Sequence, residues 1–163
     1  MSAKKSTGSG SSATGIKIIA QNRRARHEYE VLQTVECGIA LLGTEVKALR
    51  GGRVNLGDAY GEIKGGEVWL VKMHIGPYDM GNRMNHEPFR RRKLLLNRRE
   101  IRKLHPKLEE GGRTLIPLKV YFKRGRVKVE MALARGKKLH DKRQDKAKQD
   151  ADREMARVIG RRG

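Results

Sequence analysis

An alternation of apolar residues with a period of two limits most strongly what this chain can fold into. Between residues 29 and 41 every odd position is apolar except Gln33. The stretch from Val127 to Leu133 repeats the pattern, with charged or small residues between the apolar ones. Successive side chains of a strand point to opposite faces, so both stretches are predicted to be strands with one buried face. We therefore expect a mostly β body.

Glycine-containing turns indicate how further strands are joined. Strand-like runs flank Gly65-Gly66 and also Arg124-Gly125, and each arrangement predicts a β-hairpin. Apolar residues at helical spacing predict short helices within residues 43–52 and 96–104. Pro117 cannot donate a ladder hydrogen bond, so we expect the outgoing strand of the second hairpin to begin at an edge or a bulge.

These elements favour a small closed antiparallel barrel of the oligonucleotide-binding type, with short helices. A β-sandwich built from the same strands is the alternative.

Composition divides the chain into three segments. We expect a disordered Ser/Gly/Thr-rich segment over residues 1–15, a barrel domain over 16–135 and a charged tail over 136–163.

The charge of the chain favours a polyanionic partner. It carries 38 Lys+Arg against 18 Asp+Glu, a net charge of +20. Four consecutive cations, Arg90 to Lys93, precede three leucines, and Asn97 follows directly before the further cations of the predicted helix. Arg and Lys neutralise phosphates, whereas Asn can bond to base edges or sugar hydroxyls. We interpret this region as binding nucleic acid, against the alternative of a solvated charged surface.

The low aromatic content indicates which kind of nucleic acid is bound. Aromatic residues make up 4% of the chain, and we expect Trp69 and Phe122 to lie in the core. Proteins that bind single strands by stacking usually display several aromatic side chains on a sheet. The composition therefore favours a folded RNA that is recognised by its shape and backbone.

Other functional classes find little support in the sequence. No run of about 18 apolar residues could span a bilayer, and the first 15 residues lack the apolar core of a signal peptide. Cys37 is the only cysteine and is expected to be a buried structural thiol, and the five histidines lack metal-ligand spacing. We expect a cytoplasmic protein without membrane contact, cofactor, metal or catalytic residue.

The tail is predicted to be a helix of marginal stability. Ala147, Ala151, Met155 and Ile159 recur every four residues and form a narrow apolar stripe on a charged helix. Such a helix is marginal in water by itself. We expect it to be disordered or frayed in the free protein and helical on a polyanionic partner. The alternative is a solubilising tail that never orders.

Five segments in sequence resemble those of one family. "NRRARHEY", "GIALLGTEVKALRGG", "NHEPFRRRKLLLNRREI", "TLIPLKVYFKRGRVKVEMALARGKK" and "DKR" follow one another in an order and spacing that resemble the small protein B family, the transfer-messenger-RNA-binding (tmRNA-binding) proteins of bacteria. The resemblance covers about Ile18 to Arg143. It implies an oligonucleotide-binding barrel with a C-terminal extension. It also implies a non-catalytic, monomeric protein of trans-translation, the rescue of stalled ribosomes.

The resemblance also implies specific contacts. The barrel would bind the tRNA-like domain of tmRNA, and the matching positions are His27, Glu36, Arg50, Leu95 and Asn97. The tail would enter the ribosomal A site and the empty mRNA channel, where it contacts small-subunit rRNA. Its matching positions are Gly136, Lys137, Lys138, His140, Asp141, Lys142, Arg143, Val158 and Ile159. Cys37 departs from the family, where small residues are usual.

Two rival interpretations stay open. A barrel-type ribosomal protein or translation factor would bind rRNA directly and would need no tmRNA. A nuclease or RNA-modifying enzyme would need a metal or an acid–base constellation, and the sequence offers neither.

Overall fold

The computed structural model describes residues 15–80, 85–137 and 139–162, and side chains are described in all of these except 139–145 and 158–162. The first half of the chain contains β1 (Ile16–Gln21), α1 (Arg23–Glu28), β2 (Tyr29–Ile39), α2 (Gly43–Arg50), β3 (Val54–Asn55), β4 (Tyr60–Lys64), β5 (Glu67–Val71) and β6 (His74–Ile75). The second half contains β7 (Arg92–Leu95), α3 (Arg98–Glu109), β8 (Arg113–Lys123), β9 (Arg126–Gly136) and α4 (Leu139–Arg162).

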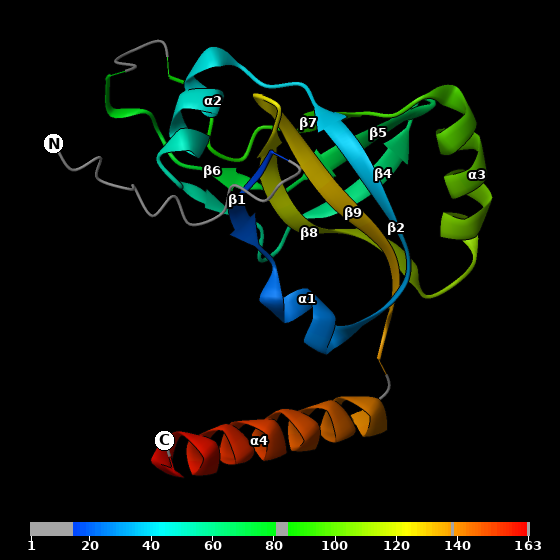
Figure 1. Ribbon diagram of the computed structural model, residues 1–163. Helices are drawn as coiled ribbons and strands as arrows, with labels where there is room; N and C mark the ends of the chain where they lie inside the picture. Colours follow the sequence, from blue (N-terminus) through cyan, green and yellow to red (C-terminus); the bar gives the residue numbers. More distant parts are fainter. Residues whose placement is uncertain (1–14, 81–84, 138, 163) are drawn as a thin grey trace, which may run out of the picture.

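The strands close into a ring, as the sequence predicts. The hydrogen-bonded order is β8-β4-β5-β7-β2-β9, and β9 pairs with β8 again. Every pairing is antiparallel, and β1 adds to β8 outside the ring. Figure 1 shows the barrel with α3 along one side, α2 at one end and α4 next to α1. The closed pairing confirms the barrel and excludes the sandwich.

Both predicted hairpins are present, and their turns have the expected backbone. Gly65 and Gly66 have φ values of +63° and +75° between β4 and β5. Arg124 and Gly125 have φ values of +52° and +77° between β8 and β9. Positive φ at both central residues gives a turn whose twist matches that of the flanking strands.

The alternating residues of β2 contribute to two cores. A bulge interrupts the β2–β9 register between Val31 and Gln33, which is where the alternation fails in the sequence. Beyond the bulge, Cys37 and Ile39 lie in the barrel interior. Before it, Tyr29 and Val31 pack against a separate cluster that covers the inner side of α1. That second cluster consists of Ala25, Ile116, Leu118, Ala132 and Ala134.

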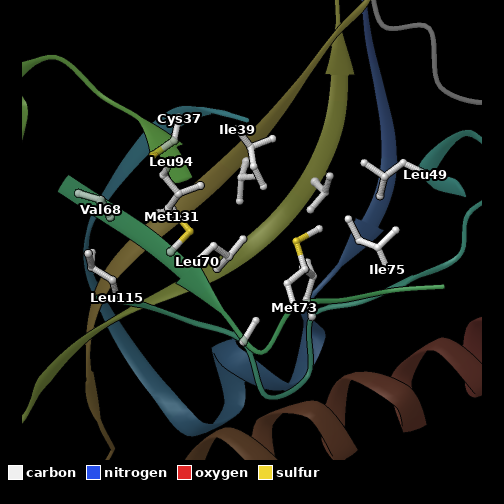
Figure 2. Close-up of a cluster of buried hydrophobic side chains, with 14 of the residues drawn as sticks. Cys37, Ile39, Leu49, Val68, Leu70, Met73, Ile75, Leu94, Leu115 and Met131 are labelled. Atoms are coloured by element: carbon white, nitrogen blue, oxygen red, sulfur yellow. The ribbon is translucent and has the colours of Figure 1, made fainter. Parts of the chain in front are cut away.

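Aliphatic side chains and methionines fill the barrel interior (Figure 2). Gly61 allows β4 to approach β8, since a Cβ there would lie 2.9 Å from the Cβ of Leu115. Cys37 is fully buried, as the sequence predicts. Burial raises the pKa of its thiol to about 12.

Several details differ from the sequence-based expectations. β8 begins at Arg113 and not near Pro117, although a bulge does follow that proline, between Pro117 and Lys119. Trp69 is only half-buried because Val68 and Leu70, its neighbours in β5, take the inward positions. Its ring lies on the outer side, with the Arg91 guanidinium 5.7 Å from the ring centre. The expectation that Trp69 belongs to the core is therefore wrong.

The tail leaves the barrel next to α1. Gly136 still pairs with Tyr29, and the Lys137 N–H donates to the Glu28 carbonyl oxygen at 3.0 Å. The described side chains of α4, residues 146–157, are all exposed. α4 contacts α1, but over residues 146–157 it buries no side chain, so this part of the helix depends mainly on local interactions. The expected dependence of this helix on RNA stays a prediction.

None of the described helices has the length and apolar character needed to cross a membrane.

Candidate nucleic-acid interface

The four consecutive cations interpreted as phosphate ligands are all paired with carboxylates. Arg90 and Arg92 both bind Glu45, and the Arg90 contact measures 2.6 Å. Arg91 pairs with Glu62, and Lys93 pairs with Glu67 at 2.7 Å. The assignment of this run to the nucleic-acid surface is thus wrong for Arg92, which is fully buried. For the other three, RNA phosphates would have to compete with an intramolecular partner.

Glu45 and Arg92 form the centre of a buried polar network. The Glu45 carboxylate also accepts from the Leu42 N–H at 2.8 Å, and Arg92 donates to the Met73 carbonyl oxygen at 2.7 Å. Burial opposes ionisation of Glu45, but hydrogen bonds from Arg90, Leu42 and Arg92 outweigh it and lower its pKa. The network connects α2, β7 and the segments on both sides of β6, so its function is structural.

The cations of α3 are different. Four exposed cations lie on this helix, and within the described residues none of them forms an ion pair: Arg98, Arg99, Arg102 and Lys103. A groove of about 690 Å³ runs between α3 and the β4–β5 turn. Its walls include Arg98, Arg102 and His105. This helix therefore presents a cluster of unpaired positive charge beside the barrel.

Asn97 fixes the start of α3. Its Oδ1 accepts from the Glu100 N–H at 2.9 Å, which makes Asn97 the N-cap. The side chain is exposed, and no hydrogen bond in the described part of the chain uses its Nδ2 group. Asn97 can therefore cap the helix and donate to a ligand at once.

Leu95 lies on the same outer surface. It is 52% exposed and pairs with Gly38 of β2. A Cβ on Gly38 would lie 3.2 Å from the Leu95 Cβ, so the absence of a side chain at Gly38 makes room for Leu95 on this face. Glu36 precedes Gly38 by two residues, and Asn97 follows Leu95 by two, so both lie just beyond the end of the β2–β7 pairing.

Glu36 carries the acidic group of this surface. Its carboxylate accepts from the Tyr121 hydroxyl at 2.5 Å and from Lys123 Nζ at 3.3 Å. The hydrogen bond from Tyr121 lowers the pKa of Glu36, and Lys123 and Lys128 act in the same direction although partial burial opposes them. We call Glu36, Leu95, Asn97 and the four free cations of α3 the β2–α3 face.

The other two barrel positions lie elsewhere. Arg50 ends α2, and its guanidinium lies 5.8 Å from the centre of the Phe122 ring, next to Tyr121 in sequence. His27 is half-buried in the last turn of α1, before β2 begins. It is therefore nearer to the start of the tail than to Glu36. The structure brings three of the five sequence-predicted residues together.

Few of the tail positions can be located at side-chain level. Gly136 is exposed and Lys137 is half-exposed, with its Nζ donating to the Arg26 carbonyl oxygen at 2.9 Å. Lys138 lies outside the described residues. The same holds for the side chains of the other predicted positions, whose backbone falls within α4: His140, Asp141, Lys142, Arg143, Val158 and Ile159.

Sequence reasoning missed Tyr121 and Lys123. Tyr121 is an aromatic residue at an outward position of β8, and its contact with Glu36 spans 85 residues. Strand alternation alone could have assigned it to the outer face. Among the described residues, no group of three His, Cys, Asp or Glu side chains could hold a metal ion.

Comparison with known proteins identifies the family. The model of the SmpB protein family matches residues 19–161. The SsrA-binding protein of Desulforudis audaxviator (strain MP104C) is 59% identical over 142 residues, which cover 87% of this chain and 93% of the relative. That of Parafrankia sp. (strain EAN1pec) is 58% identical over 148 residues, covering 91% and 94%.

A solved structure agrees with these relatives. A chain from the structure described as "tmRNA-SmpB: a journey to the center of the bacterial ribosome" superposes with a TM-score of 0.63 at 51% identity. The match covers 74% of this chain and 85% of that chain. With its closed barrel and a family match over most of its length, the chain belongs to the SmpB family.

Proposed function

We propose that this protein binds the tRNA-like domain of tmRNA and delivers it to stalled ribosomes for trans-translation. Its relatives are named for binding SsrA, and the similar solved structure concerns tmRNA and SmpB on the bacterial ribosome. The observation that carries the proposal is the β2–α3 face, where a carboxylate, an amide and an exposed leucine lie beside unpaired cations. Cations position an RNA through its phosphates, whereas amide and carboxylate groups read bases or sugars.

Each part of the face has a separate role. The cations of α3 contact phosphates of the tRNA-like domain, and Leu95 packs against a base or sugar. Asn97 donates from its amide while it caps α3, and Glu36 accepts from a base. Arg50 and His27 make outlying contacts with the same RNA. The protein acts in the cytoplasm as a monomer and binds RNA without catalysis or cofactor.

The tail performs the second step of the function. Its segment from Gly136 to Arg143 occupies the decoding centre, and the helix beyond, with Val158 and Ile159, follows the path of the missing mRNA. An exposed cationic helix suits a channel with RNA walls because its charges meet phosphates there. An mRNA that fills the channel excludes the helix, so the tail reports that the channel is empty.

The proposal is tested by the RNA that the protein selects. Pull-down from a bacterial lysate should recover one dominant RNA with a tRNA-like end. Recovery of bulk rRNA alone would support the rival ribosomal protein or translation factor. If RNA is cleaved or modified after incubation with the protein, the alternative of a nuclease or RNA-modifying enzyme is supported.

A point substitution tests the face itself. Glu36→Ala should weaken binding to the isolated tRNA-like domain, whereas Glu30→Ala should leave it unchanged. Glu30 is the matched control because it is an exposed acid on the same strand, paired with Arg135 at 2.7 Å. Equal affinities of the two variants would contradict the assignment of Glu36.

A further inference from the structure

We propose that Tyr121 is a positioning residue, which holds the Glu36 carboxylate so that it accepts from the Watson–Crick edge of an unpaired guanine. The inference rests on the proposed function, because it requires Glu36 to lie in the RNA interface. It adds a residue that the sequence analysis did not select, and it names the chemical group that the carboxylate recognises.

The geometry separates a hidden donor from an accessible acceptor. Tyr121 is 3% exposed, whereas the Glu36 side chain is 39% exposed. The phenol donates to Oε2, and Lys123 Nζ lies at 3.3 Å from both carboxylate oxygens. RNA can therefore reach the carboxylate but not the phenol. A change at Tyr121 would affect the RNA only through Glu36.

The surroundings keep this carboxylate charged. Lys123 on β8 and Lys128 on β9 are its nearby cations. Glu130 lies opposite Glu36 in the β2–β9 register, but Lys119 pairs with it at 3.2 Å and offsets its charge. The hydrogen bond from Tyr121, with the two cations, lowers the pKa of Glu36. Glu36 is thus an acceptor with no proton to donate at neutral pH.

An acceptor of this kind is selective among the groups of an RNA. Phosphates and base carbonyls repel it, whereas N–H groups bind it. Guanine presents two adjacent donors, N1–H and N2–H, which match the two oxygens of one carboxylate. Adenine and cytosine each offer one amino group beside a ring nitrogen that is itself an acceptor. Each carboxylate oxygen has two lone pairs. Tyr121 and Lys123 together use both on Oε2, so guanine can donate to both oxygens only when it displaces Lys123 Nζ from its 3.3 Å contact with Oε2, while the bond from Tyr121 stays.

The first test removes only the phenolic hydroxyl from the full-length protein. Tyr121→Phe keeps the ring and should weaken binding to the tRNA-like domain by up to about ten-fold, because an untethered Glu36 carboxylate must then be ordered when RNA binds, at a cost of at most about one hydrogen bond to a charged group. Tyr60→Phe, at a half-buried tyrosine of β4, is the control and should bind like the wild type. Thermal unfolding of both variants confirms that the fold is retained.

A double-mutant cycle shows whether Tyr121 acts through Glu36. In a Glu36→Gln background, Tyr121→Phe should cause no further loss of affinity. Tyr121→Phe should also move the acidic decline of binding to higher pH, because the pKa of Glu36 rises without its donor. Full additivity of the two losses, or an unchanged pH profile, would overturn the positioning role.

Modified RNA tests the guanine. Inosine lacks the N2 amino group, so replacing unpaired guanosines by inosine one at a time should weaken wild-type binding at one position. The same RNA should bind Glu36→Gln no more weakly than the unmodified RNA does. Removing single ribose 2′-hydroxyls is the alternative series. If one such removal weakened binding to the wild type but not to Glu36→Gln, and no inosine did, the Glu36 carboxylate would accept from a ribose hydroxyl and the guanine assignment would be wrong.

Failure of the inference can be told apart from failure of the proposed function. If Glu36→Gln binds like the wild type, Glu36 lies outside the RNA interface and the β2–α3 assignment falls. If Glu36→Gln weakens binding while a folded Tyr121→Phe does not, the face stands and only the role of Tyr121 is rejected. Should Tyr121→Phe not fold, the inosine series with Glu36→Gln still decides the recognition of guanine.

Discussion

Arg92 of β7 and Glu45 of α2 form an ion pair in which both side chains are fully buried. The pair joins a strand of the barrel to the helix at its end. The other two guanidinium nitrogens of Arg92 are used as well, since they bond to the carbonyl oxygens of Met73 and Pro88 at 2.7 and 3.1 Å. A charge of this kind is tolerated in the interior only while its partner is present.

Replacing Arg92 alone should therefore destabilise the protein strongly. Arg92→Met should lower the free energy of unfolding by about 3–5 kcal/mol, because Glu45 keeps an inadequately paired charge in the interior. Urea unfolding followed by circular dichroism measures the loss. Lys93→Met, which breaks the exposed pair with Glu67, is the matched control and should cost no more than about 1 kcal/mol.

The pH dependence has a defined direction. The pKa of Glu45 lies below its ordinary value of 4.5 in the folded protein. Its contribution to stability is therefore complete above pH 4.5 and declines as the pH falls through the lowered value. Glu45→Gln should flatten the loss of stability in that acidic range. An equally steep acid transition in this variant would show that other carboxylates control it.

Asn97 should have two separable roles. Asn97→Ala removes the cap of α3 and should cost about 1 kcal/mol of stability as well as RNA affinity. Asn97→Ser keeps a capping oxygen but lacks the amide donor, so it should retain most of the stability and still bind RNA weakly. Unfolding and binding measurements on both variants separate the roles. If Asn97→Ser is stable and binds RNA with wild-type affinity, Asn97 only caps α3 and does not contact the RNA.

The strands were predictable where local sequence determines them. Alternation identified β2 and β9, and glycine-containing turns identified two hairpins. β7 was not predicted as a strand. Its first two residues, Arg92 and Lys93, and the preceding Arg91 were interpreted as surface cations. Their carboxylate partners lie on other elements, as Glu45 does for Arg92 across 47 residues. Local patterns carry no information about such pairing.

The functional face was predictable only in part, for the same reason. Leu95 and Asn97 are neighbours in sequence, and the family resemblance supplied Glu36. The contact between Glu36 and Tyr121 depends on the joint register of β2, β9 and β8. Trp69 shows the converse error: its apolar neighbours suggested burial, but a five-residue strand does not reveal from sequence which face is inward.

The free cations of α3 should account for part of the salt dependence of RNA binding. Arg98→Gln and Arg102→Gln should each weaken binding and reduce the slope of log K against log salt by about 0.7–0.9, one phosphate contact each. Arg91→Gln is the matched control, because its guanidinium is already paired with Glu62. If Arg91→Gln lowers the slope as much as Arg98→Gln, pairing within the chain does not exclude phosphate contact.

Removal of the tail should separate RNA binding from ribosome rescue. The structure places the cut after Lys137, because Gly136 still pairs with Tyr29 and Lys137 bonds to Glu28. A chain that ends there keeps the whole barrel and the β2–α3 face. Its affinity for the tRNA-like domain should stay within about three-fold of the full chain, since only a few electrostatic contacts are lost. Peptide tagging on stalled ribosomes should be abolished, because nothing enters the mRNA channel.

The same pair of chains tests whether the tail helix depends on RNA. The difference between their circular dichroism spectra at 222 nm is the contribution of residues 138–163. A helix whose described side chains are all exposed is only partly formed in water, so this difference should be small for the free proteins and grow on the ribosome complex. A full helical signal in the free chain would mean that the tail enters the channel preformed. If the truncated chain still supports peptide tagging, the tail has no required role in the mRNA channel.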